Sequence, residues 1–358
     1  MKCLLQRVLT LFLAVSMGIA MAGCGSQSET EAEATDDVCM ATAGIPADTV
    51  LFTVDGQDVT AEKYLYWAVR MLDSYYYYYG EDGDYSWISA CWDTGMSDAA
   101  LNNLLYYMLP RIHASEFGLE DDDAGLEAEV EEQIADYKAD YEDEAGFEDY
   151  FQENCISESG FRKILAERLN SQKLKAYLYG EGSAYAPRDD EILSWADELG
   201  YYNCRYVFVS TVYYYTDEAL ERAAERAQII LDNIALAEDQ DAYFAEIAAD
   251  SSWNDDTEDG VGRLTAGGDI CEKFDEAVRA LKIGEISGIV DDSDEYGYFI
   301  IQRLAIDPDD LRETCISDLF NQQIGEWIDG AEIVYTDAFE TIDITSFYSN
   351  LIDYRASL

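Results

Sequence analysis

The spacing of apolar residues changes once along this chain, near residue 202, and that change limits the folds open to it. Between residues 60 and 199, apolar side chains recur three and four positions apart in several segments, as they do in amphipathic helices. From residue 202 onward, short runs rich in Val, Phe and Tyr alternate with helical segments, which is typical of a mixed α/β unit. The sequence therefore predicts an α+β protein whose first part is mainly helical.

The individual elements follow from the same periodicity and from capping residues. A strand is expected over 50–54, and the tyrosine run 75–79 and the loop 80–85 are expected to break the helix that opens at Thr60. Further helices are expected over 98–117, 123–141, 146–154, 157–179 and 188–199. The second part predicts the order β-α-α-β-α-β-β, with strands over 204–210, 286–290 and 297–304 and helices over 216–237, 241–250 and 270–280. A helix over 311–327 and an extended tail follow.

The first 23 residues have the form of an export signal. Lys2 and Arg7 precede an apolar stretch over 8–22, which is shorter than the about 20 apolar residues that a membrane-spanning helix needs. Small residues at 22–23 directly before Cys24 resemble the lipobox of bacterial lipoproteins. The resemblance implies that Cys24 is diacylated and becomes the mature N-terminus. The alternative is an ordinary signal peptide that happens to contain a cysteine.

The segment that follows Cys24 is small, polar and acidic as far as about residue 47. Such a composition cannot bury enough apolar surface to fold, so 24–47 is expected to be a flexible tether. Six of the eight cysteines remain once Cys3 is removed with the signal and Cys24 is lipidated, at positions 39, 91, 155, 204, 271 and 315. Their scattered spacing, without a CxxC pair, argues against a zinc site or a redox dithiol and leaves disulfide pairing open.

Charge excludes several functions. The chain carries 22 Lys and Arg against 75 Asp and Glu, a net charge of −53, so neither nucleic acid nor an anionic lipid surface finds a basic face. A single histidine leaves little scope for histidine-ligated metals. The acidic runs 255–260 and 291–295 fail the calcium-loop template, because its twelfth position falls on Ala266 or Arg303. No metal or cofactor is predicted.

Six short segments of the second part together resemble the parvulin domain, a peptidyl-prolyl isomerase module: 205–209, 244–248, 260–262, 274–277, 281–287 and 296–301. With the flanking helices and the lipobox, the chain resembles PrsA-type foldase lipoproteins and their SurA-type periplasmic relatives. That resemblance implies a helical chaperone module, formed by N-terminal helices and a C-terminal helix, that carries an inserted parvulin unit. The expected parts are a signal peptide 1–23, a tether 24–47, a helical domain 48–200, a parvulin-like domain 202–305 and a C-terminal helix and tail 306–358.

The resemblance also places the site residues. Active parvulins usually carry a histidine in the first strand, a Cys or Asp next, and a histidine in the last strand; here these positions hold Tyr206, Asn254 and Phe299. The positions that hold the proline ring fall on Ile270 and Phe274, with Val261 nearby. Tyr206 keeps a polar tip and Phe299 cannot hydrogen-bond, so isomerase activity is expected to be weak or lost.

These observations together predict an extracytoplasmic folding factor, anchored to the bacterial membrane through Cys24, whose partners are unfolded or partly folded secreted polypeptides. The alternative is an active peptidyl-prolyl isomerase for X-Pro bonds of secreted proteins. Rotation about an amide needs no proton transfer, only a site that binds the twisted state better than the planar ones. A site with the Tyr206 and Phe299 pair could therefore still work.

Overall fold

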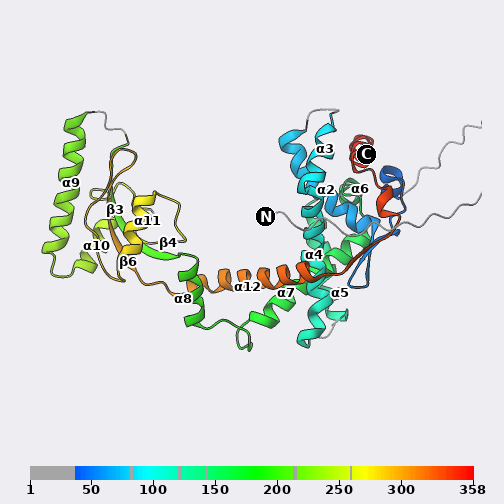
Figure 1. Ribbon diagram of the computed structural model, residues 1–358, viewed down its shortest axis with the longest axis horizontal. Helices are drawn as coiled ribbons and strands as arrows, with labels where there is room; N and C mark the ends of the chain where they lie inside the picture. Colours follow the sequence, from blue (N-terminus) through cyan, green and yellow to red (C-terminus); the bar gives the residue numbers. More distant parts are fainter. Residues whose placement is uncertain (1–36, 81–83, 120–122, 142, 213–215, 259) are drawn as a thin grey trace, which may run out of the picture. The chain divides into compact units, whose positions relative to one another are not determined.

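The structure is a computed structural model that describes residues 37–358 except 81–83, 120–122, 142, 213–215 and 259 (Figure 1). The export signal, Cys24 and most of the expected tether lie outside this range. Among the residues described, no helix combines the length and the apolar character needed to cross a membrane.

The first part of the chain is mainly helical. Its elements are α1 (Val38–Ala43), β1 (Val50–Val54), β2 (Gln57–Thr60), α2 (Ala61–Tyr79), α3 (Ser86–Cys91), α4 (Ser97–His113), α5 (Asp123–Ala139), α6 (Glu144–Glu153), α7 (Glu158–Tyr179) and α8 (Asp189–Glu198). Capping residues set the helix ends: Ser157 Oγ accepts a hydrogen bond from the Gly160 N–H at 2.9 Å, and Gly118, which has a φ of 82°, ends the 3₁₀ helix Ala114–Phe117 that follows α4. The helices expected near 98–117, 123–141, 146–154, 157–179 and 188–199 are therefore present.

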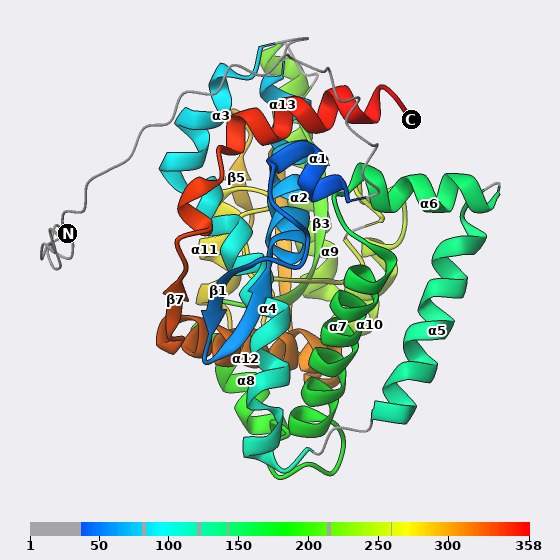
Figure 2. The same cartoon turned by 90° about the vertical axis from the view of Figure 1, so that its right-hand side faces the viewer.

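The last part returns to the first. It consists of α12 (Pro308–Gly330), β7 (Ile333–Tyr335) and α13 (Ile344–Arg355). Strand β7 pairs antiparallel with β1, placing Phe52 opposite Tyr335, and completes a three-stranded sheet in the order β2-β1-β7. Helix α13 lies beside α1 (Figure 2), where Asn350 donates to the Thr42 carbonyl at 2.9 Å. An extended tail was expected after α12; part of it is instead the helix α13, whose apolar side chains Phe347, Tyr348 and Leu351 are buried in the core of the first part.

Two further expectations differ from the structure. Residues 37–47 are folded, although a flexible tether was expected to reach residue 47: Asp37 caps α1, and Val38, Cys39 and Ile45 are buried. These three apolar side chains hold the segment against the core. Helix α2 also continues through the tyrosine run to Tyr79, because tyrosine is compatible with a helix and Tyr75 and Tyr76 pack against the core.

The central segment, residues 202–305, contains a four-stranded antiparallel sheet in the order β4-β3-β6-β5. Its elements are β3 (Tyr202–Ser210), α9 (Asp217–Leu236), α10 (Gln240–Ala248), β4 (Arg263–Thr265), α11 (Glu272–Ala280), β5 (Val290–Asp292) and β6 (Gly297–Leu304). This is the expected β-α-α-β-α-β-β order, and the α+β fold class is confirmed. Strand β5 begins at Val290, whereas Ile286 forms only an isolated bridge with Gln302.

Alternation along the two central strands gives this sheet two different faces. Val207, Val209 and Ile300 pack against α9 and α10. Tyr206, Phe299 and Ile301 point to the other face, where they meet Phe274 and Val278 of α11. Figure 1 shows α9 on one side of the sheet and α11 on the other. The residues at the expected site therefore belong to the face that α11 covers.

Candidate active site

Three aromatic side chains occupy the place where the resemblance puts the isomerase site. Tyr206 of β3, Phe274 of α11 and Phe299 of β6 form an aromatic cluster with ring centroids 5.2 Å, 5.2 Å and 6.0 Å apart, all at steep angles. Phe208 stacks on Phe299 at 4.6 Å. The exposed fractions of Tyr206, Phe274 and Phe299 are 1%, 0% and 2%. The structure thus brings these three predicted residues together and buries them.

The hydroxyl group of Tyr206 forms a hydrogen bond within the protein. Its hydroxyl hydrogen-bonds to Asp256 Oδ2 at 2.6 Å, and its backbone N–H donates to the Gly260 carbonyl at 2.8 Å. Both partners belong to the acidic run 255–260. Tyr206 therefore holds this loop against β3 and does not present its hydroxyl to solvent.

Asn254, at the position of the family's Cys or Asp, is also buried, with 1% of its surface exposed. Its side-chain N–H groups donate to the carbonyls of Tyr206, Ala248 and Asp256 at 3.1, 2.7 and 2.8 Å. Its Oδ1 accepts from the backbone N–H groups of Phe208 and Asp256 at 2.8 and 3.1 Å. The amide joins strand β3, the end of α10 and the acidic loop, so its role in this conformation is structural.

The expected proline-binding residues are only partly assembled. Ile270 is half-buried and packs against the aromatic cluster, next to Phe274. Val261 is 48% exposed and does not belong to that core as the structure describes it. Since Phe274 has no exposed surface, a bound proline ring cannot reach it unless the cluster opens.

Three titratable groups near the cluster, Tyr202, Cys204 and Cys271, have raised pKa values and are neutral. Burial and a hydrogen bond from its hydroxyl to Asp275 Oδ1 at 2.6 Å raise the pKa of Tyr202. Burial raises the pKa of the Cys204 thiol to about 12 and also raises the pKa of Cys271. Neither thiol is a thiolate at neutral pH, so neither is a ready nucleophile.

The acidic loops use their carboxylates on protein partners. Asp255 accepts from the Arg226 guanidinium at 3.0 Å and from the Ser210 N–H at 2.8 Å. Asp292 pairs with Lys273 at 2.8 Å. Across the ranges that the structure describes, no group of three or more His, Cys, Asp or Glu side chains is arranged to hold a metal ion.

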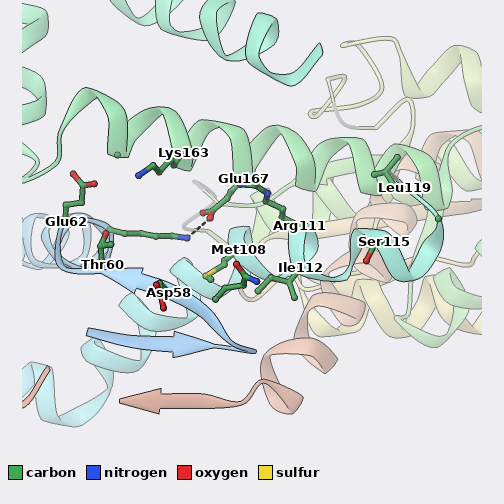
Figure 3. A pocket seen from close by; sticks show the side chains of 14 residues that line it. Asp58, Thr60, Glu62, Met108, Arg111, Ile112, Ser115, Leu119, Lys163 and Glu167 are labelled. Atoms are coloured by element: carbon green, nitrogen blue, oxygen red, sulfur yellow. Dashed lines mark hydrogen bonds and ion pairs between the residues drawn. The ribbon is translucent and has the colours of Figure 1, made fainter. Parts of the chain in front are cut away.

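A second candidate site, which the sequence did not reveal, is a cavity of about 920 Å³ in the helical part (Figure 3). Residues of β2, α2, α4 and α7 line it. Lys63 and Glu167 form an ion pair of 2.5 Å across it, whereas Arg111 and Lys163 are exposed and form no ion pair with any described residue. These cations lie up to about a hundred positions apart, so no local motif could have indicated the cavity. His113, the single histidine of the sequence, stacks on Trp327 with ring centroids 4.7 Å apart.

Comparison with known proteins bears on the central segment. Residues 209–305 match the family model described as rotamase, a PPIC-type PPIase domain. This segment belongs to the PPIC-type domain family. The match begins inside β3, just after Tyr206, and the PPIC-type domain includes Asn254, Val261, Ile270, Phe274 and Phe299. The parvulin resemblance of the sequence is thereby confirmed for the domain.

Solved structures with some likeness to the chain are themselves foldases and chaperones. PrsA from Bacillus subtilis is 18% identical with a TM-score of 0.24, and the match covers 73% of this chain and 84% of that one. The foldase PrsA from Lactococcus lactis is 14% identical with a TM-score of 0.32, over 84% and 98% of the two chains. A SurA-like chaperone of Campylobacter jejuni is 11% identical with a TM-score of 0.23, over 80% and 99%. No curated protein matches the sequence. At these identities and scores, the structural likeness adds no argument to the domain match.

Proposed function

We propose that this chain is a membrane-anchored extracytoplasmic folding factor whose PPIC-type domain has weak or lost isomerase activity. The observation that supports the proposal is the aromatic cluster: Tyr206, Phe274 and Phe299, at positions that the resemblance assigns to the isomerase site, are buried against one another. A domain that retains the fold of an isomerase and closes its site is better suited to a structural or binding role than to turnover.

The energetics of the cluster support low activity. An isomerase must bind the twisted X-Pro amide, whose rotation barrier is about 18–20 kcal/mol. A proline ring can enter here only if Phe299 or Phe274 leaves its buried position. Removing such a side chain from a core costs about 3 kcal/mol or more. Each 1.4 kcal/mol is a factor of ten in occupancy, so the open site is populated about a hundredfold less than the closed one.

The helical part supplies surfaces for unfolded chains. Tyr77, Tyr78 and Tyr79 at the end of α2 are 83%, 75% and 60% exposed. Exposed aromatic side chains in a row form a patch of the kind that binds other polypeptides. The strong negative charge of the chain keeps complexes soluble and favours basic clients, most strongly at low salt. We infer that clients are unfolded or partly folded secreted polypeptides.

An aggregation assay with the full chain tests this function. The chain is expected to suppress light scattering by an unfolded basic client at low salt, because client binding does not depend on turnover. A matched variant replaces residues 204–303 with Gly-Ser-Gly. Asn203 and Leu304 are direct partners in an antiparallel pair, so their backbones are about 5 Å apart and a short linker joins them. The variant is expected to keep its helical circular dichroism and to suppress scattering like the full chain.

Two outcomes would contradict the proposal. Unchanged scattering with the full chain would mean that it is no folding factor for such clients. If the deletion variant folds but no longer suppresses light scattering, the surface that binds clients lies in the PPIC-type domain.

Anchoring is a separate prediction that rests on the lipobox alone, since Cys24 lies outside the described residues. The native chain is expected in the membrane fraction, with a lipid on Cys24 as its first residue. Cys24→Ala removes the acylated thiol, and most of this variant is expected to be unprocessed or released. Cys91→Ala is the matched control and should stay anchored. An unlipidated mature terminus at another residue, found by mass spectrometry, would rule out the lipoprotein.

A further inference from the structure

Two cysteines far apart in the sequence meet in the core of the helical part. The sulfur atoms of Cys39 and Cys155 lie 3.2 Å apart, although the residues are 116 positions apart in the sequence. Their exposed fractions are 2% and 0%. The other four cysteines of the described chain, at positions 91, 204, 271 and 315, contact no second cysteine. This pairing is therefore a particular feature of one place in the fold.

The two cysteines lie in different elements of the fold. Cys39 lies on α1, which Asp37 caps through the Met40 N–H at 2.9 Å. Cys155 lies in the turn between α6 and α7, where the Ile156 N–H donates to the Phe151 carbonyl at 3.0 Å. Cys39 Sγ also lies 3.5 Å from the Cys155 carbonyl oxygen. Both cysteines are thus held by backbone hydrogen bonds in elements that do not depend on the sulfur contact.

The backbone of Cys155 points to a role for its side chain. Its φ is +52°, in the left-handed region. After a helix, this conformation favours glycine or asparagine, because other side chains are strained there. Glycine would adopt this turn conformation with less strain. We therefore attribute the cysteine at this position to its thiol.

We propose that Cys39 and Cys155 form a disulfide in the exported chain. A disulfide needs a sulfur separation of about 2.0 Å, and small side-chain rotations close the remaining gap of about 1 Å. This inference rests on the extracytoplasmic location in the proposed function, because disulfides persist outside the cytoplasm.

The bond forms by thiol–disulfide exchange with an oxidised small-molecule disulfide or an oxidoreductase disulfide of that compartment. One cysteine thiolate attacks the oxidant's S–S bond and releases one of its sulfurs as a thiol, leaving a mixed disulfide. The second cysteine thiolate displaces the other sulfur. The cysteine pair loses two electrons, the oxidant gains them, and the two cysteine protons end on the oxidant's thiols.

Burial sets the order of events. The neighbouring Cys155 and burial raise the pKa of the Cys39 thiol, so the folded reduced protein has almost no reactive thiolate at this place. The exchange therefore takes place before the core closes, and the finished bond is shielded from reductants. The disulfide links α1, the first helix of the described chain, to the turn between α6 and α7.

Peptide mapping of the exported chain, purified with free thiols blocked, tests the proposal. Cleavage after lysine and arginine leaves the six cysteines in separate peptides, which end at residues 63, 111, 162, 205, 273 and 355. The expected major product is the peptide 139–162 linked to the peptide that ends at Lys63, with fragment ions that place the bond on Cys39 and not on Cys24. Blocking groups on both Cys39 and Cys155, or a bond from either to another cysteine, would overturn it.

Thermal unfolding gives a second measurement. A bond that closes a loop of 116 residues should raise the melting temperature of the helical part, so Cys39→Ala and Cys155→Ala should each lower it by roughly 5–10 °C. The double variant should lose no more than either single variant, because both remove the same bond. Cys91→Ala, which touches no other cysteine, should change it little. Losses that add in the double variant would contradict the disulfide. The aggregation assay can be run with reductant present throughout, so its failure and the failure of this bond are distinguishable.

Discussion

Asn254→Ala is expected to lower the free energy of unfolding of the PPIC-type domain by about 4 kcal/mol. The substitution leaves three carbonyls and two backbone N–H groups without the partners that the Asn254 side chain gives them. Each buried polar group left unpaired costs about 1–3 kcal/mol, less where water enters the space that the amide vacates. Urea unfolding, followed by tryptophan fluorescence and far-UV circular dichroism, measures the change.

Two further variants sharpen this test. Asn203→Ala is the matched control, because Asn203 is half-buried and makes one side-chain hydrogen bond, to the Ala305 carbonyl; its effect should stay within about 1 kcal/mol. Asn254→Asp brings in an acid that active parvulins can carry at this position. It is nevertheless expected to destabilise the domain, since a carboxylate would face three carbonyl oxygens and donate to none. An Asn254→Ala domain as stable as the native one would show that the loop is held by other contacts.

Much of the fold could be predicted because local signals agree with it. Alternation along 204–210 and 297–304 identified the two central strands, and capping residues such as Ser157 marked helix starts. Helices α1 and α13 were missed because they are short, 6 and 12 residues, and contacts with each other and with the core stabilise them. Their stability comes from tertiary packing, which no local window contains.

The candidate site was predictable only in part. The sequence placed Tyr206, Asn254 and Phe299 at the family's positions, and the structure brings Tyr206, Phe274 and Phe299 into one cluster. The three rings are buried because α11 packs against the sheet. This packing cannot be predicted from the individual residues. The five hydrogen bonds of the Asn254 side chain likewise form only where β3, the end of α10 and the acidic loop come together. The Cys39–Cys155 contact joins residues too far apart for spacing to indicate a pair.

The second large effect concerns catalysis. The full chain is expected to accelerate isomerisation of a proline peptide at least about tenfold less than an intact parvulin site, which corresponds to roughly 1.4 kcal/mol of barrier. Tyr206→His together with Phe299→His is expected to raise the rate more than either change alone, because the two positions face each other in one cluster. Imidazole is also smaller than the rings it replaces, so the pair opens space beside Phe274. Tyr298→His changes an aromatic residue on the opposite face of β6 and should leave the rate unchanged.

The most direct test of the account is the isomerisation rate of the native full chain, measured on an X-Pro peptide in a protease-free assay with an active parvulin as the reference. The closed aromatic cluster predicts a rate close to the uncatalysed one, with relaxation over tens to hundreds of seconds at 25 °C. A native chain that matches the reference parvulin would contradict the account, because it would show that Tyr206, Phe274 and Phe299 open readily to admit a proline ring.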